Sequence, residues 1–251
     1  MNSYFFILKD LVKKTLKSRY ASTFLGIFWA VLSPVLIMIA INLIFIKFLN
    51  IDFKNYHIFV LCGILPWLFV SSSISESLYS LISNLRLLPQ VRFPYICFPI
   101  ATALVEFVEH CLALVFLIPV FIFYNLKIIK YLPLIIFLLF FMALFVISLS
   151  IIFSILNIYF KDIKHFLGVG LMFWFWMTPI FYLPQMIPER YRCFVWINPL
   201  SYFITIYRDI LFYGRLSNMW IWIGIVGISI FSFAFSFILF NKVKYDLVKR
   251  I

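Results

Sequence analysis

Four ionisable residues interrupt long apolar stretches of the sequence, and their types could support proton chemistry. Glu76 stands in one stretch, while Glu106, Glu109 and His110 stand in another, with Glu106 and His110 spaced to pair on one helical face. Ionisable groups inside a bilayer are costly, so they usually face a bundle interior or water and often mark a pathway. They could relay protons or act as acid and base, or they could simply bond neighbouring helices together. The sequence leaves these alternatives open.

No other pattern indicates a reaction in this chain, so we assign no catalytic residue. No serine stands in a G-x-S-x-G turn, and no glycine is followed by lysine, which excludes a phosphate-binding P-loop. The acids and His110 lack a further set of ligands, and the four cysteines lack metal-ligand spacing, so we expect no metal and no cofactor. Any ATP that drives this protein must therefore bind to another chain.

The composition indicates a membrane protein with several spans. Hydrophobic residues make up 65% of the 251 positions and charged residues 12%, whereas soluble domains average about 45–50% and about 25%. The net charge of +12 does not indicate nucleic acid, because the basic residues stand in short pieces between apolar runs. Positive residues at cytosolic span ends, facing anionic membrane lipid, explain them better.

We predict an all-α membrane protein with six transmembrane helices in a single domain over residues 1–251. Each apolar run approaches or exceeds the roughly 20 residues that a bilayer requires, and the first is too long for a signal peptide. The predicted spans are residues 24–49, 58–82, 95–124, 132–157, 166–183 and 219–241.

Residues 5–18 have the spacing of a basic amphipathic helix, which is expected to lie in the headgroup plane rather than to span. The alternative is a solvated start of the first span. The apolar face would carry Phe5, Leu8, Val12 and Leu16, and the basic face Lys9, Lys13 and Lys17.

The distribution of Lys and Arg predicts that both termini are cytosolic. Basic residues concentrate before the first span, in the loops 84–94 and 159–165, and after the last span. These short charged loops suit docking to a cytosolic partner, but they equally suit anchoring at the inner membrane surface.

The segment 184–217, on the outer side, is broken by proline. Pro184, Pro188 and Pro199 interrupt an otherwise apolar helical pattern. We predict short re-entrant or gate helices here, against the alternative of an ordinary outer loop. Because exposed ion pairs contribute only about 0–1 kcal/mol, we expect loss of one charge to change gating rather than folding. The predicted outer-gate residues, which could pair with each other or meet lipid phosphate, are Arg190, Arg192, Arg208 and Asp209.

Aromatic residues make up 22% of the chain, and aromatic faces stack on sugar rings, so an aromatic-lined path would suit a glycan. Most of the 33 Phe are expected to face lipid. The predicted pathway residues are Phe28, Trp29, Phe173, Trp174, Trp176, Phe181 and Tyr182.

Two stretches resemble a known family. Residues 19–34 read RYASTFLGIFWAVLSP, and residues 162–214 contain DIKHFLGVG, TPIFYLP, NPLSYF and YRDILFYG. Both resemble the permease subunit of bacterial polysaccharide exporters of the ABC-2 type, which include O-antigen, capsule and teichoic-acid permeases. The resemblance extends over essentially the whole chain.

The resemblance implies a homodimer in the bacterial inner membrane, bound to two copies of a cytosolic ATPase that holds ATP and Mg²⁺. It implies export of a lipid-linked glycan along a path lined by spans 24–49 and 166–183 at the dimer interface. Lys161 departs from the arginine expected before Asp162. The resemblance assigns ATPase coupling to Lys9, Lys13, Arg86 and Arg92, and an inner gate to Lys161, Asp162 and Lys164.

Two other classes of function stay open. A proton-coupled transporter would use Glu76, Glu106, Glu109 and His110 without any ATPase, although the sequence shows no internal repeat. A membrane enzyme acting on a lipid-linked substrate would use Glu106 and His110 as acid and base. A neighbouring gene for a P-loop protein would favour the exporter over both.

Overall fold

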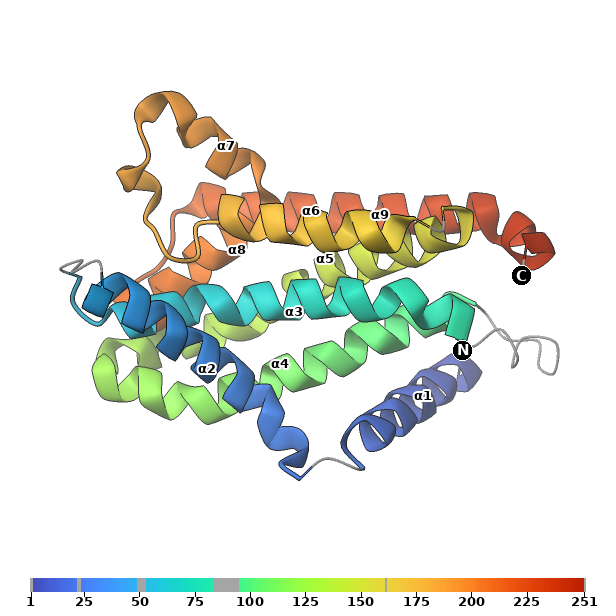
Figure 1. Cartoon of the computed structure of the whole chain (residues 1–251), viewed down its shortest axis with the longest axis horizontal. Coiled ribbons are helices and arrows are strands. Elements are labelled where there is room, and N and C mark those ends of the chain that lie inside the picture. Colours follow the sequence, from blue (N-terminus) through green and yellow to red (C-terminus); the bar gives the residue numbers. More distant parts are fainter. Residues whose placement is uncertain (1, 22–23, 49–52, 84–94, 161, 251) are drawn as a thin grey trace.

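The computed structural model describes the whole chain except residues 1, 22–23, 49–52, 84–94, 161 and 251, and the described residues contain helices and no strands (Figure 1). The α-helices are α1 (Asn2–Tyr20), α2 (Trp29–Asn42), α3 (Tyr56–Ser83), α4 (Cys97–Tyr124), α5 (Leu132–Tyr159), α6 (Ile163–Met177), α7 (Arg192–Ile197), α8 (Pro199–Arg208) and α9 (Met219–Arg250). Short 3₁₀ turns precede α2, α5 and α7, and π-helical turns follow α2 (Leu43–Phe48) and α8 (Asp209–Tyr213).

Five helical segments of the described chain are long and apolar enough to cross a membrane. They correspond to five of the six predicted spans, and the number six stays a prediction. The bounds of the five are Gly26–Lys47, Tyr56–Ser83, Cys97–Tyr124, Leu126–Tyr159 and Met219–Lys244.

The remaining predicted span, 166–183, contains α6, which is only 15 residues long. Its helix ends at Met177 because Thr178 precedes Pro179 and takes an extended conformation, with φ −86° and ψ 133°. A residue before proline is pushed away from the helical region by the proline ring. The segment therefore continues beyond Met177 as non-helical backbone.

Helix α3 forms the centre of the bundle. It packs against α2, α4 and α5, and 78% of its most apolar window is buried, against 22% for α9. Gly63 of α3 permits a close approach, since a Cβ there would lie 3.0 Å from the carbonyl oxygen of Ile180. The turn after α6, residues 178–183, thus packs directly against the central helix α3.

The long helices run side by side, and the two termini lie at the same end of the molecule (Figure 1). The arm formed by residues 184–197, which carries α7, projects at the other end. That both termini lie on the cytosolic side of the membrane stays a prediction.

Helix α1 lies beside α4 (Figure 1). Leu8, Val12 and Leu16 are half-buried, whereas Lys9 and Lys13 are exposed. The amphipathic character of α1 and its position in the headgroup plane stay predictions.

Candidate functional site

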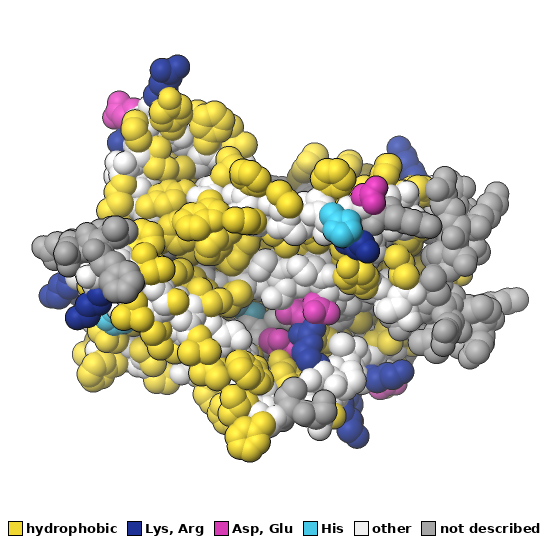
Figure 2. Space-filling view, viewed as in Figure 1, with side chains coloured by type: hydrophobic (Ala, Val, Ile, Leu, Met, Phe, Trp, Pro, Cys, Tyr) yellow, Lys and Arg dark blue, Asp and Glu magenta, His cyan; other side chains and the backbone are white. Residues whose placement is uncertain are grey.

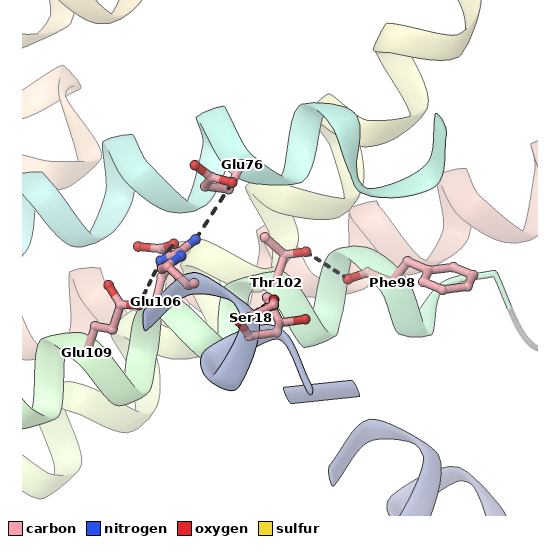
Figure 3. A network of polar contacts seen from close by, with 8 residues as sticks. Ser18, Glu76, Phe98, Thr102, Glu106 and Glu109 are labelled. Carbon is pink, nitrogen blue, oxygen red and sulfur yellow. Dashed lines mark hydrogen bonds and ion pairs between the residues drawn. The ribbon is translucent and has the colours of Figure 1, made fainter. Parts of the chain in front are cut away.

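The acids predicted to lie within the membrane meet at an arginine from α1. The Nη1 atom of Arg19 lies 2.6 Å from Oε1 of Glu106 and 2.7 Å from Oε1 of Glu109, and Nη2 lies 3.7 Å from Oε2 of Glu76. Figure 3 shows Glu106 and Glu109 on α4 and Glu76 on α3, with the end of α1 between them. The cluster joins three helices.

Water is partly excluded from the cluster. The side chain of Glu106 is 6% exposed, that of Glu109 is 15% exposed and that of Arg19 is 26% exposed, while Glu76 is open at 58%. Burial disfavours the charged guanidinium, but Glu106 and Glu109 more than offset this and raise the pKa of Arg19 above its ordinary value. Arg19 therefore stays charged, and three carboxylates share one cation.

The cluster lines a cavity of about 450 Å³ between α1, α2, α3 and α4. In Figure 2, acidic side chains flank a basic one where the surface is hollowed. Aromatic and hydroxyl groups complete the wall, including Tyr20, Trp29, Ser33 and Ser72. Burial and a hydrogen bond to Glu109 raise the pKa of Tyr20. The cavity thus combines a largely apolar lining with three acidic side chains that surround Arg19.

The spacing on α4 suggested that His110 pairs with Glu106, but each side chain has a different partner. Its Nε2 atom lies 2.6 Å from the hydroxyl of Tyr207 on α8, and its ring stacks on Phe69 with 5.0 Å between centroids. Glu106 faces Arg19 of α1 instead. His110 consequently connects α4 to α8.

Arg208 is buried, whereas the sequence predicts an exposed gate charge. Its Nη2 atom donates to the carbonyl of Ile180 at 2.6 Å, and its guanidinium lies 3.7 Å from the centroid of the Phe59 ring. It does not pair with Asp209, which instead accepts from Nε of Arg215 at 2.7 Å. Arg208 therefore joins α8, α3 and the turn after α6.

The non-helical turn after α6 receives its hydrogen bonds from side chains. Besides the bond to Ile180, Nη1 of Arg208 donates to the carbonyl of Tyr182 at 3.5 Å, and the hydroxyl of Tyr56 donates to the carbonyl of Phe181 at 2.9 Å. Backbone at membrane depth is tolerated where protein or water satisfies it. This turn has such partners within the protein.

Asn198 ties the start of α8 to the end of α6. Its Oδ1 atom accepts from the indole Nε1 of Trp174 at 2.9 Å and from the backbone N of Leu200 at 3.0 Å. Its Nδ2 atom donates to Oγ1 of Thr178 at 2.9 Å. Asn198 is therefore a helix cap and a cross-helix link, which explains why the chain breaks before Pro199.

Arg190 and Arg192 both lie on the projecting arm. Arg192 stabilises the arm internally, since it donates to the carbonyl of Ile187 at 3.1 Å and pairs with Glu189 at 3.2 Å. Arg190 is exposed and lies over the ring of Tyr191. Of these two, Arg190 is the freer to meet an anionic group outside the chain.

The predicted pathway aromatics fall into two sets. Phe28, Trp29, Phe173 and Trp176 are exposed on α6 or at the start of α2. Trp174, Phe181 and Tyr182 are buried or half-buried, and they pack or bond within the chain.

An apolar groove of about 280 Å³ lies between α2 and α6, with α3 as its floor. Its lining includes Ile37 of α2, Trp67 of α3, and Met172 and Phe175 of α6. The two helices predicted to line a path are thus placed on either side of one groove.

The remaining predicted residues are only partly described. Lys9 and Lys13 are exposed on α1, and Asp162 and Lys164 are exposed at the start of α6. Arg86, Arg92 and Lys161 lie outside the described residues.

Comparison with known proteins identifies the family. The model of the ABC-2 type transporter family matches residues 8–212. The chain belongs to the ABC-2 type transporter family. The ABC-2 match begins within α1 and ends in the π-helical turn after α8, so it includes the Arg19 cluster and the arm.

Curated relatives match nearly the whole chain. Two O-antigen export system permease proteins RfbA from Klebsiella pneumoniae are 33% and 32% identical to this chain, over 96% of it and 93% of each relative. A protein of the same name from Myxococcus xanthus is 28% identical over 84% of this chain and 82% of that relative.

Several residues of the site could not be assigned from the sequence. Arg19 stands in the stretch that resembles ABC-2 permeases, but nothing in that stretch indicates its partners on α3 and α4. Tyr207 and Asn198 carry weaker signals still, because a tyrosine in an apolar helix and an asparagine before proline are common. Their roles depend on contacts between helices far apart in sequence.

Proposed function

We propose that this chain is the permease subunit of an ATP-driven exporter that moves a lipid-linked polysaccharide of the O-antigen type across the bacterial inner membrane. The observation that carries the proposal is the similarity to O-antigen export permeases over 96% of the chain. A capsule or teichoic-acid glycan is the alternative substrate within the same family.

The groove between α2 and α6 supports a route for the lipid carrier. Its apolar lining suits acyl or isoprenoid chains, and the exposed Trp29, Phe173 and Trp176 offer faces on which sugar rings can stack. Two copies that met along α2 and α6 would enclose these aromatics. In this homodimer, the start of α6 with Asp162 and Lys164 forms the inner gate, and the arm with α7 closes the outer side.

The ATPase is a separate subunit that supplies ATP and Mg²⁺. The exposed face of α1, with Lys9 and Lys13, is the surface that supports its docking. Two copies of the ATPase bind one permease dimer, and the loop 84–94 adds a second contact on each side.

The test expresses this chain with a partner ATPase in cells that lack their own permease. Polysaccharide should reach the cell surface, as measured with a glycan-specific antibody or lectin. It should stay inside when the P-loop lysine of the ATPase is replaced, and the purified permease alone should hydrolyse no ATP. Export that continues without ATP hydrolysis would contradict the proposal.

A proton-coupled transporter is the second candidate, favoured by one observation. Glu76, Glu106, Glu109 and His110 do line a single cavity. Export that persisted without the ATPase but stopped when a protonophore dissipated the proton gradient would establish this candidate. Chemical turnover of a lipid-linked glycan by the purified chain would instead establish the membrane enzyme.

A further inference from the structure

Helix α1 is attached to the long helices at two points that differ in chemistry. Near its middle, Leu11 packs against Leu81 of α3 and Phe98 of α4. At its end, Arg19 reaches the acids of the same two helices. The two points are eight residues apart, or about 12 Å along a helix. Because α1 is held at two points, a rotation of α1 can be transmitted to α3 and α4. A single apolar contact would let α1 slip against them.

The attachment through Arg19 is strong, and its geometry fixes which acids the guanidinium contacts. The guanidinium is a planar fork, so it holds Glu106 and Glu109 of α4 on one nitrogen while its other nitrogen faces Glu76 of α3. Ion pairs that are partly removed from water cost more to break than exposed ones, because the partners are left uncompensated. Without Arg19, three carboxylates would face one another.

The contacts continue from the cluster toward the arm. His110 lies one turn beyond Glu106 on α4 and meets Tyr207 of α8. The next residue, Arg208, holds the turn after α6 through the carbonyl of Ile180. A movement of α4 therefore has a polar connection to the elements that form the outer segment.

We propose that Arg19 is a positioning residue that transmits movement of α1 to α3 and α4, and so couples ATP hydrolysis to export. The inference rests on the proposed function, because it takes the ATPase to act on α1. It adds that the charge cluster is the mechanical connection, and not a substrate, proton or metal site.

The experiment uses the complete complex of permease and ATPase. The ATPase rate of the purified complex in lipid vesicles and the export rate in cells are measured for each variant, and their ratio is compared with that of the wild type. The variants are Arg19→Gln, Arg19→Lys and a triple variant with Arg19→Gln, Glu106→Gln and Glu109→Gln. Lys130→Gln is the matched control, since Lys130 is an exposed cation that lies outside α1 and outside the proposed docking surface.

Arg19→Gln should leave ATP hydrolysis within about twofold of the wild type and lower export per ATP about tenfold. The triple variant should behave alike, because it removes the repulsion without restoring the connection. Arg19→Lys should lower the ratio about threefold, since a point charge cannot hold carboxylates of two helices as a fork does. Lys130→Gln should match the wild type.

A wild-type ratio in the triple variant would overturn the inference, because the cluster would then serve folding alone. If the triple variant does not accumulate, Arg19→Lys decides: a reduced ratio supports the inference and an unchanged ratio contradicts it. A wild-type complex that neither hydrolyses ATP nor exports would instead refute the proposed function, whatever the variants do.

Discussion

Arg208 shows how a single residue can hold a charge inside this bundle. Its guanidinium stacks on Phe59 and donates to the carbonyl of Ile180, so both its flat face and its edge are used. Arg208→Ala would remove these contacts and leave a buried carbonyl without its donor. We expect a loss of unfolding free energy of about 2–3 kcal/mol, measured as a lower thermal midpoint in detergent.

Arg190→Ala is the matched control, because Arg190 is exposed on the arm. It should change the unfolding free energy by less than about 0.5 kcal/mol. If Arg208→Ala unfolded like the wild type but failed to export, the guanidinium would act in gating or on lipid phosphate, as the sequence predicts.

The bond between His110 and Tyr207 provides a second test at this scale. Tyr207→Phe removes the hydroxyl and leaves a buried ring nitrogen of His110 without that partner. The cost should be about 1–3 kcal/mol. The pair Tyr207→Phe with His110→Phe should cost less than the sum of the two single variants, because the second change removes the unsatisfied group. Additive costs in this double-mutant cycle would show that the contact is energetically unimportant.

The contacts between residues of the site were the feature hardest to predict from the sequence. The spacing of Glu106 and His110 correctly placed them on one helical face, but it could not show that each faces a different neighbour. Arg19 and Glu106 meet only because of the depth and rotation that α1 adopts against α4. Those quantities depend on packing over the whole bundle, so no local pattern encodes them.

At the scale of elements, Asn198 is expected to govern the mobility of the arm. Asn198→Ala removes the cap of α8 and the links to Trp174 and Thr178. The loss should be about 1–2 kcal/mol, and amide hydrogen exchange over residues 184–197 should become faster.

Asn218→Ala is the comparison for this experiment. The side chain of Asn218 accepts from the backbone N of Trp220 at the start of α9. Exchange should rise only around that helix start. Equal exchange of the arm in Asn198→Ala and the wild type would show that the prolines alone position it.

The elements themselves were largely predictable. Long apolar runs gave bounds close to α3, α4 and α5, and the prolines at 184, 188 and 199 marked breaks that the structure contains. The end of α6 was placed too late, because the apolar run continues to Leu183 while the helix stops at Met177. Apolar residues alone therefore do not mark the end of this helix, which is set by Pro179.

At the scale of the whole molecule, the predicted membrane topology can be tested by labelling a native cysteine. Cys193 is exposed on α7, whereas Cys62 is buried. A membrane-impermeant maleimide should label Cys193 in spheroplasts, and Cys193→Ser should abolish the labelling. Labelling that appeared only after permeabilisation would place the arm in the cytosol and reverse the orientation.

The hydrogen-bonded turn after α6 has a consequence for the bilayer around the protein. Helix α6 has 15 residues, or about 22 Å, which is shorter than a hydrocarbon core of about 30 Å. Because Tyr56 and Arg208 satisfy the carbonyls of the turn, that backbone does not depend on water at the surface. Export should therefore vary little when acyl chains are lengthened in reconstituted vesicles. In Tyr56→Phe, the carbonyl of Phe181 would need water, and export should fall as the bilayer thickens.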